Sequence, residues 1–374
     1  MIDAAKLSLK KRVALNLYAA KRSMDAVAHD LRYLFWECTL RCNLHCLHCG
    51  SDCTHDSAAA DLPLEDFLAV LDSIKKKLDP RHIVICITGG EPLMRSDLTR
   101  AGEEISRRGF RWGMVTNGML MTAGRLRELQ KAGLASLTIS LDGLEADHSW
   151  FRGNTDSFKK AVRAIGFAAT AVQNNSLSDF DVITCANQRN LGSLDSIKRK
   201  LIGLGVRKWR IVSVFPKGRA AANRELLLTP EQMKNLMEFI RKTRSEGVIA
   251  ASYGCEGFLG GYEMEVRESP FFCRAGISIG SVLIDGSISA CPSLRADYVQ
   301  GNIHTDDFLE IWNNRFSVMR NRSWARTGEC LTCKVWRHCH GNGLHLRDEK
   351  SGNLLFCNYK ALTTTAAASG KSHS

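Results

Sequence analysis

The 374-residue sequence predicts a parallel α/β protein followed by a smaller, cysteine-rich unit. Between residues 31 and 245, short apolar runs alternate with longer stretches that carry apolar residues at helical spacing. After residue 247 this alternation stops, and glycine, cysteine and short apolar runs dominate. We therefore predict four regions: a basic helical segment at 1–30, an α/β domain at 31–247, a second domain at 248–360 and a disordered tail at 361–374.

The individual elements of the α/β region follow in order. Six apolar runs of strand length predict strands at 31–38, 82–88, 110–116, 136–141, 181–186 and 209–214. Amphipathic stretches predict helices at 64–78, 122–131, 157–172, 194–204 and 230–244. Thr229 before Pro230 is a typical helix start. Helical crossovers require parallel strands, and the repeat length is that of the βα units of a barrel. An active site is then expected at the carboxyl ends of the strands.

Composition and charge exclude several classes of protein. With 44% hydrophobic and 24% charged residues the chain is globular. No apolar stretch is long enough to span a membrane, and the N-terminus lacks the apolar core of a signal peptide, so we predict a cytoplasmic protein. The net charge of +12 is interpreted as a solvated surface plus a basic N-terminal helix, because no nucleic-acid-binding pattern accompanies it. Fourteen cysteines in such a protein indicate metal or redox chemistry rather than disulfides.

The first cysteine cluster is the strongest single signal. Cys42, Cys46 and Cys49 lie in the loop directly after the first predicted strand. Three thiolates can hold a [4Fe–4S] cluster and leave one iron without a protein ligand, where a small molecule could bind. The spacing alone also allows zinc, with His45 or His48 as the fourth ligand.

Polar motifs end the next three predicted strands. Gly89, Gly90 and Glu91 form a Gly-Gly-Glu-Pro turn that exposes backbone groups and offers a carboxylate to an amino group. The two following strands end in Thr-Asn-Gly and Ser-Leu-Asp-Gly. Their short polar side chains, which suit ribose hydroxyls, are Asn117, Ser140 and Asp142. Each motif alone is a common turn. Their occurrence at successive strand ends beside three cysteines indicates one shared ligand site.

Taken together, these motifs resemble those of the radical S-adenosylmethionine (SAM) superfamily, across about residues 31–245. The resemblance implies a partial (β/α)6 barrel in which Cys42, Cys46 and Cys49 hold a [4Fe–4S] cluster. SAM would chelate the open iron through its amino and carboxylate groups. Reductive cleavage would then give methionine and a 5′-deoxyadenosyl radical that abstracts a substrate hydrogen.

The same resemblance implies contacts to SAM. It places the motif residues Gly89, Gly90 and Glu91 at the amino group, and Ser140 and Asp142 near the ribose. It places Arg152 near the carboxylate, where a guanidinium fork is apt, although a surface ion pair is the alternative. Val214 would lie beside the adenine or, equally, in the core. One departure is His48, which stands where an aromatic residue is common.

The C-terminal cysteines form a second pattern. Cys330, Cys333, Cys339 and Cys357 can close a metal or cluster site, and spacing does not separate zinc from iron–sulfur. The region resembles the SPASM extension of radical SAM peptide and protein maturases. This implies one auxiliary [4Fe–4S] cluster at these four cysteines.

In the same pattern, Cys273 and Cys291 would serve a second auxiliary cluster. The cysteine expected after Cys339 is missing, because position 343 is glycine. Three alternatives stay open: Cys255 joins Cys273 and Cys291 and leaves an open iron, His340 or His345 substitutes, or only one auxiliary cluster forms. We favour the first.

The resemblance implies oxidative modification of a peptide or protein, such as a crosslink or another C–H functionalisation. The auxiliary clusters would act in electron transfer or substrate binding, and a flavodoxin- or ferredoxin-type donor would supply low-potential electrons. Pro292 replaces the aspartate of sulfatase maturases, which disfavours that chemistry. The alternatives are a small-molecule enzyme acting on a tetrapyrrole side chain or a sugar, and, more remotely, a non-catalytic metal-binding protein. No catalytic acid or base is identified.

Overall fold

The computed structural model describes residues 7–254 and 256–363. Its framework is one ten-stranded sheet in the order β10-β9-β8-β1-β2-β3-β4-β5-β6-β7. The strands are β1 (Tyr33–Glu37), β2 (Val84–Thr88), β3 (Arg111–Thr116), β4 (Leu134–Ser140), β5 (Asp179–Ala186), β6 (Lys208–Ser213), β7 (Ala250–Tyr253), β8 (Ile279–Val282), β9 (Ser287–Ser289) and β10 (Gly301–Asn302). From β1 to β7 all neighbouring strands are parallel, as the helical crossovers require.

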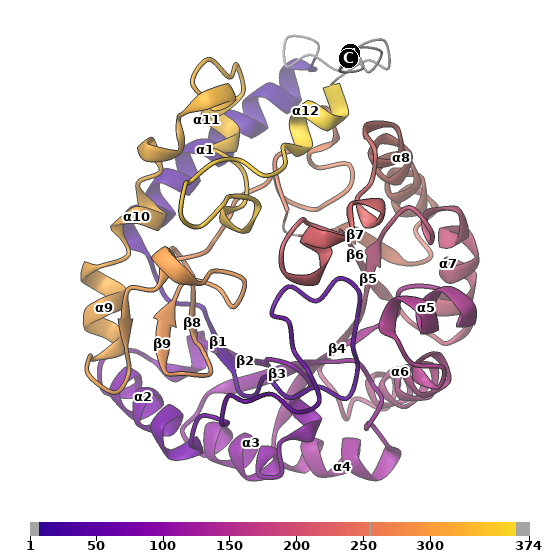
Figure 1. Ribbon diagram of the computed structural model, residues 1–374, viewed down its shortest axis with the longest axis vertical. Helices are drawn as coiled ribbons and strands as arrows, with labels where there is room; N and C mark the ends of the chain where they lie inside the picture. The colour runs from indigo at the N-terminus through magenta and orange to yellow at the C-terminus, as the bar shows by residue number, and fades with distance from the viewer. Residues whose placement is uncertain (1–6, 255, 364–374) are drawn as a thin grey trace.

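Helices cover the outer side of this curved sheet (Figure 1). They are α2 (Leu64–Lys77), α3 (Leu98–Arg107), α4 (Ala123–Lys131), α5 (Glu145–Arg152), α6 (Ser157–Gln173), α7 (Leu194–Gly203) and α8 (Pro230–Glu246). The N-terminal α1 (Leu9–Ala28) lies beside α10 (Ser317–Arg320) and α11 (Trp336–Cys339), whereas α9 (Phe308–Asn314) packs on α2 and α12 (Asn358–Thr363) packs on α8. Among the described residues, no helix is both long and apolar enough to cross a membrane.

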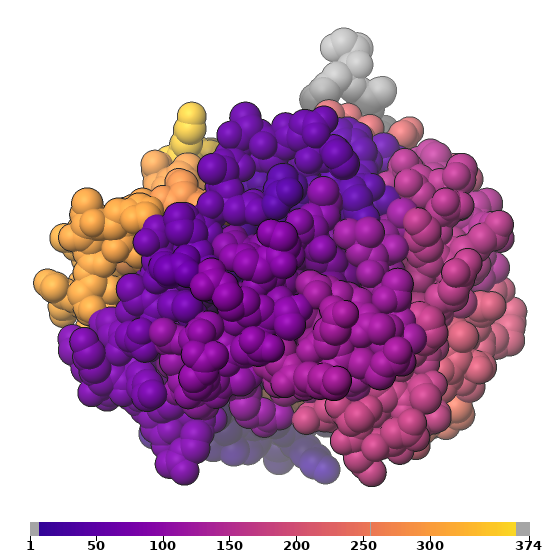
Figure 2. Space-filling model, turned by 90° about the horizontal axis from the view of Figure 1, so that it is seen from below, coloured from indigo at the N-terminus to yellow at the C-terminus, as the bar shows by residue number. Residues whose placement is uncertain are grey.

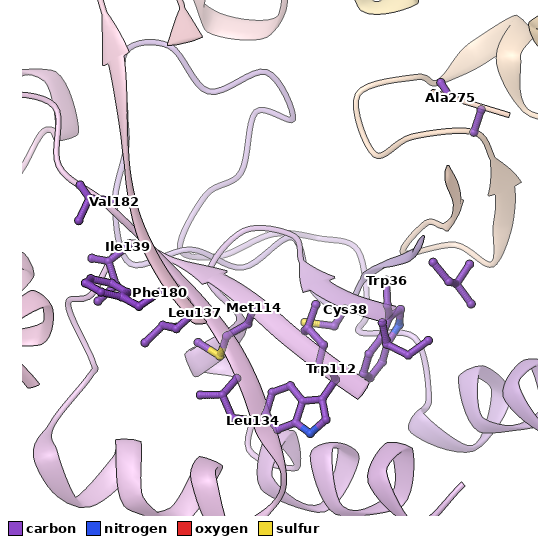
Figure 3. Packing of buried hydrophobic residues seen from close by; sticks show 14 of the residues in the cluster. Trp36, Cys38, Trp112, Met114, Leu134, Leu137, Ile139, Phe180, Val182 and Ala275 are labelled. Carbon is purple, nitrogen blue, oxygen red and sulfur yellow. The ribbon is translucent and has the colours of Figure 1, made fainter. Parts of the chain in front are cut away.

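The core lies between the sheet and the helices, because alternate strand residues point outward. In β2, Ile85 and Ile87 are fully buried, whereas the alternate residues are half-buried and face the inside of the curved sheet. Trp36 of β1 stacks on Phe67 of α2 with ring centroids 4.4 Å apart. Figure 3 shows Trp112, Met114, Leu134 and Leu137 gathered in the same layer.

The predicted strands and helices of the α/β region are present, with ends shifted by a few residues. The predicted N-cap is also found: Thr229 and Gln232 form a reciprocal capping box at the start of α8. Two helices were not predicted. α3 has few apolar residues, and α5 buries the polar His148 and Arg152 rather than an apolar stripe.

The second region is less separate than the sequence suggested. β7 lies beyond the predicted boundary at 247, yet it extends the sheet from β6. The chain then returns to the other edge, where β8 pairs in parallel with β1, and β9 and β10 add antiparallel strands. In the space-filling view the C-terminal region lies directly against the N-terminal segments (Figure 2). The predicted disordered tail is wrong at residues 361–363, which belong to α12, while residues 1–6 and 364–374 lie outside the described residues.

Candidate active site

The first cysteine cluster lies in the long loop between β1 and α2, over the centre of the strands in Figure 1. Cys42 and Cys46 are buried together with Leu44 and Cys53, and Cys49 packs against this group. The backbone N–H of Cys42 donates to the carbonyl of Thr54 at 2.8 Å. The loop therefore folds back on itself and turns its three thiols toward one side.

Two arginines from later in the chain contact this loop. Arg219, after β6, donates to the carbonyl of Cys46 at 2.7 Å and to that of Cys53 at 3.1 Å, and it pairs with Asp52 at 2.7 Å. Arg152, at the end of α5, donates to the Cys46 thiol at 3.6 Å. Both cations thus lie within reach of the cysteine loop.

The Gly-Gly-Glu-Pro turn lies directly beneath the loop. A Cβ atom on Gly89 or Gly90 would collide with the carbonyl oxygen of Thr39 or Arg41, so only glycine lets the two segments approach this closely. The N–H groups of Gly90 and Glu91 donate to these same carbonyls at 2.7 and 2.9 Å.

Glu91 links two of the predicted motifs rather than facing the ligand. Its buried carboxylate accepts from the Thr116 hydroxyl at 2.7 Å, the Asn117 N–H at 2.8 Å and the Leu93 N–H at 3.1 Å. Asn117 is thereby placed beside the cysteine loop, where its amide donates to Asn43 at 2.8 Å and lies 3.9 Å from the Cys42 thiol.

Asp142 likewise contacts neighbouring protein groups and does not line the cavity. Its carboxylate pairs with Arg152 at 2.6 Å and accepts the Cys185 N–H at 2.8 Å. Its own N–H donates to His148 Nδ1 at 3.0 Å. All of these groups are buried or nearly so, which makes the orientation of Arg152 rigid.

A cavity of about 770 Å³ opens above these groups. Eight of the predicted residues of the first site line it: Cys42, Cys46, Cys49, Gly89, Gly90, Asn117, Ser140 and Arg152. Three predicted SAM contacts do not line it, namely Glu91, Asp142 and Val214. Glu91 and Asp142 are fully engaged with protein groups, and Val214 packs with Phe151, Ala220 and Leu226, which is the core alternative.

The thiols of the cavity differ in their surroundings. Hydrogen bonds from Cys53 lower the pKa of the Cys49 thiol to about 5. Burial raises the pKa of Cys42 to about 12. A thiol must lose its proton to ligate iron, and the surroundings favour the thiolate at Cys49 and the thiol at Cys42.

His48, the unusual residue of the motif, lies in the cavity wall. Its ring stacks on Phe151 with centroids 4.1 Å apart and an interplanar angle of 3°. Burial lowers its pKa to about 3, so the ring is neutral, and its Nδ1 atom has no partner in the described structure. A neutral ring, flat against another ring, suits contact with a planar heterocycle.

The C-terminal cysteines gather into two groups. Cys330, Cys333, Cys339 and Cys357 lie close together: burial and the charges of the other three raise the pKa of Cys339 to about 12. Three of the four accept hydrogen bonds, from Arg347, Asn342 and Lys360. No three ligands of the His, Cys, Asp or Glu type in the described residues are arranged for a single metal ion.

The second group contains Cys273 and Cys291, which interact electrostatically. Cys255, their predicted companion, lies outside the described residues. At the missing cysteine, a Cβ on Gly343 would crowd the carbonyl of Glu256 and the ring of His345, so the backbone leaves no room for a side chain.

The two histidine alternatives differ in their contacts. His340 stacks on Trp336, and its Nε2 atom meets Arg22 at 2.6 Å, so this ring nitrogen is engaged with α1. His345 lies against Phe215 of the cavity wall, with ring centroids 5.0 Å apart. The ligand set of this second group stays a prediction.

Family models match both the α/β region and the cysteine-rich C-terminal region. The radical SAM superfamily model matches residues 36–182, and the SPASM iron-sulfur cluster-binding domain model matches residues 273–334. The chain is a radical SAM enzyme with a SPASM domain. It binds SAM and iron–sulfur clusters.

Known proteins of this kind are similar along most of the chain. The AdoMet-dependent heme synthase of Nitratidesulfovibrio vulgaris is 24% identical over 91% of this chain and 95% of its own length. The PqqA peptide cyclase of Rhizobium meliloti is 24% identical over 80% and 78%. In fold, Streptococcus suis SuiB bound to S-adenosylmethionine matches with a TM-score of 0.66 at 15% identity, covering 88% of this chain and 77% of that one.

The residues of the cavity suit these cofactors. Three thiols share one wall with two glycines, an arginine and an unpartnered, stacked His48 ring. Sequence reasoning missed Arg219 and His148, because a single arginine or histidine in a polar stretch carries no pattern. The glycine before Arg219 was a weak sequence signal for this contact, because Gly218 lies against the backbone of Gly50, where a side chain would not fit.

Proposed function

We propose that this radical SAM enzyme oxidises a C–H bond of a carboxylate-bearing substrate, with a tetrapyrrole side chain as the first candidate. The observation that carries the proposal is the set of cations in the cavity wall, which are Arg152, Lys217, Arg219, Arg295 and Lys350. Four of them pair with the carboxylates of Asp142, Glu349, Asp52 and Glu37, and Lys350 forms no ion pair within the described residues. Lys350 and the N–H groups that the paired arginines leave free can therefore donate to a carboxylate of the substrate.

Apolar groups accompany these cations in the outer wall. Phe215, Pro216, Pro292 and Leu355 line the cavity near Lys217 and Arg295. A large, flat, apolar body with carboxylate arms matches this combination better than a sugar does. The similarity to a heme synthase, which extends over nearly the full length of both chains, supports the same class.

A peptide or protein is the second candidate, and it is the class that the sequence favoured. The PqqA peptide cyclase supports it, although the similarity spans less of both chains. An acidic peptide would also complement the cations of the wall. A crosslink or another C–H functionalisation stays the predicted chemistry for such a substrate.

When bound, SAM and the cluster at Cys42, Cys46 and Cys49 supply a 5′-deoxyadenosyl radical that removes a hydrogen atom from the substrate. The chain itself does the positioning. Gly89 and Gly90 let the backbone at Thr39 and Arg41 pack directly on this turn, and Arg152, held by Asp142, presents a fixed guanidinium to the cavity. Arg219 keeps the cysteine loop closed over the site.

The test is made with anaerobically reconstituted protein. We would measure iron per chain and 5′-deoxyadenosine release, with Fe-coproporphyrin III or an acidic peptide as substrate. Iron near four, eight or twelve atoms per chain counts one, two or three clusters. Porphyrin-dependent deoxyadenosine release with a change in porphyrin mass supports the first candidate, and a mass change in the peptide alone supports the second. Zinc in place of iron, without deoxyadenosine, would overturn the proposal.

A further inference from the structure

A second hollow, of about 350 Å³, lies between α1 and the C-terminal region. Its wall shares no residue with the cavity of the SAM site. α1 contributes Arg22 and Val27, and the facing segments contribute Phe272, Arg320 and Arg322. In Figure 1 these elements, α1, α10 and α11, run side by side at one edge of the molecule.

Two cysteines of the SPASM region line this hollow. Cys339 belongs to the group of four, and Cys273 is the partner of Cys291. The residue after Cys291, Pro292, lines the SAM cavity. The hollow therefore brings the protein surface to both cysteine groups from the side away from the substrate.

The arginines of the hollow donate to backbone carbonyls rather than to carboxylates. Arg22 donates to the carbonyls of Arg337 and His338 at 2.9 Å, and Arg322 donates to those of Met319, Asn342 and Cys273 at 3.0 to 3.2 Å. Neither arginine forms an ion pair with a carboxylate of the described chain. Arg320, the third arginine of the wall, also forms no ion pair with a carboxylate of the described chain, and its partners are also carbonyls. Carbonyls satisfy the N–H groups but leave the positive charge in place.

Exposed cations lie in the segment 326–337, directly before Cys339 and His340 of the wall. Arg326, Lys334 and Arg337 are exposed, and none of them forms an ion pair within the described residues. Arg326 lies over the ring of Trp336, which in turn stacks on His340 in the wall of the hollow. We call the surface made by the exposed Arg326, Lys334 and Arg337 and the half-buried Arg320 the basic face; Arg22 and Arg322 are buried in the wall of the hollow.

We propose that the basic face is the docking surface for an acidic one-electron carrier protein. The carrier gives up one electron and is oxidised, the enzyme is reduced by one electron, and no atom is transferred. Radical SAM chemistry requires an external electron, and the basic face is where the surface comes to the cysteine groups. Its charge complements an acidic carrier and would steer it to this site.

Exposed apolar residues complete such a surface. Met24 is 72% exposed and Val27 is 80% exposed, and Val27 also borders the hollow. Small interfaces with an apolar patch inside a charged rim are typical of transient electron-transfer complexes. Anionic membranes and nucleic acids also bind basic surfaces, but neither has a reason to sit over two groups of cluster-binding cysteines.

The test measures binding without SAM or substrate, so its failure leaves the proposed substrate class untouched. The probe is an acidic plant-type [2Fe–2S] ferredoxin, titrated into the anaerobically reconstituted full chain by calorimetry in 50 mM salt. The variant Arg326→Glu/Lys334→Glu/Arg337→Glu reverses exposed charges outside both cavities. The matched control, Arg127→Glu/Lys131→Glu/Arg163→Glu, makes the same charge change at exposed positions on α4 and α6.

We expect the first variant to weaken ferredoxin binding at least tenfold, the control to weaken it less than twofold, and 200 mM salt to weaken binding to the unmodified chain. Equal affinity of both variants would overturn the proposal. So would binding of phosphatidylglycerol vesicles or of DNA, but not of ferredoxin, to the same face.

A second measurement uses only the unmodified chain, so its result does not depend on whether the variants fold. Carbodiimide joins lysines to carboxylates in contact, so the unmodified chain is crosslinked to ferredoxin and mapped by mass spectrometry. We expect the crosslink at Lys334. Crosslinks confined to Lys131 or other residues of α4 would contradict the proposal.

Discussion

At the scale of single residues, Arg152 bridges the carboxylate of Asp142 and the thiol of Cys46. Its Nε atom pairs with Asp142 at 2.6 Å, and its Nη1 atom reaches the Cys46 thiol at 3.6 Å. Arg152→Lys keeps the charge but cannot make both contacts at once. We expect the dissociation constant of SAM to rise about 10- to 100-fold, equivalent to about 1–3 kcal/mol, with iron content unchanged. Equilibrium dialysis of reconstituted protein measures this change.

A matched control is Arg189→Lys. Arg189 also pairs with an aspartate, Asp147, at 2.7 Å, and it lies over the ring of Trp150, but it does not line the cavity. SAM affinity should therefore be unchanged. If both variants bound SAM as tightly as the unmodified chain, Arg152 would have no part in holding SAM.

His148 makes the stability of the apo protein sensitive to acid. Its Nδ1 atom must be unprotonated to accept the Asp142 N–H at 3.0 Å, and burial lowers its pKa from 6.5 to about 4, with Asp142 and Arg152 acting in opposite directions. The unfolded chain binds this proton below about pH 6.5, but the folded chain does not until about pH 4. Stability is therefore lost as pH falls through this window, by about 3 kcal/mol in total.

The variant His148→Gln tests this linkage, because its amide oxygen accepts the same hydrogen bond without titrating. Between pH 7 and pH 5 the unmodified apo protein should lose about 2 kcal/mol more unfolding free energy than the variant. Urea unfolding with reduced thiols measures it. His82→Gln, at an exposed position, should behave like the unmodified chain, and equal losses in all three proteins would contradict the linkage.

At the scale of elements, the sequence predicted what depends on local pattern. Strands with continuous apolar residues, such as β2, and amphipathic helices, such as α2, could be recognised from their periodicity. α5 could not, because it buries His148 and Arg152, whose burial is explained only by their contacts with Asp142.

The candidate site shows the same limit. The motif residues were predicted to gather at the strand ends, and they do. Which of them line the cavity was not predictable, because Glu91 and Asp142 contact other motifs instead of the cavity. Only long-range geometry separates a residue that touches a ligand from one that positions its neighbour.

The packing of α3 on β3 gives a prediction with an internal control. A Cβ atom on Gly102 would overlap the Trp112 ring, which is fully buried and donates to the carbonyl of Ala132 at 3.1 Å. Gly102→Ala gains about 1 kcal/mol of helix propensity but overpacks a fixed ring at a cost of about 1–3 kcal/mol. We expect a net loss of up to about 2 kcal/mol in urea unfolding.

Gly166, inside α6, is the control for this substitution. Nothing lies within 4 Å of a Cβ placed there. Gly166→Ala should therefore stabilise the protein by about 1 kcal/mol through helix propensity alone. The two alanine variants should differ in sign. A stabilising Gly102→Ala would show that Trp112 moves easily and that α3 is not fixed by this contact.

At the scale of the whole molecule, the SPASM region completes the sheet of the radical SAM region. β8 covers the edge of β1 along Tyr33–Trp36, and the indole of Trp312 donates to the carbonyl of His29 at 3.0 Å. α1 is held from the same side, through Arg22. The strand that precedes the first cysteine cluster is thus supported by residues some 250 positions later in the chain.

A chain ended after Tyr253 tests this dependence. It keeps β1 to β7 but leaves the backbone N–H and C=O groups of β1 unpaired on one side. An open edge of this kind pairs readily with another chain. We expect this shortened chain to elute as oligomers or to precipitate, whereas a chain ended after Thr363, which retains all described elements, should elute as the full-length protein does. Size-exclusion chromatography with circular dichroism makes the comparison, and a folded, monomeric shortened chain would show that β1 needs no partner from the SPASM region.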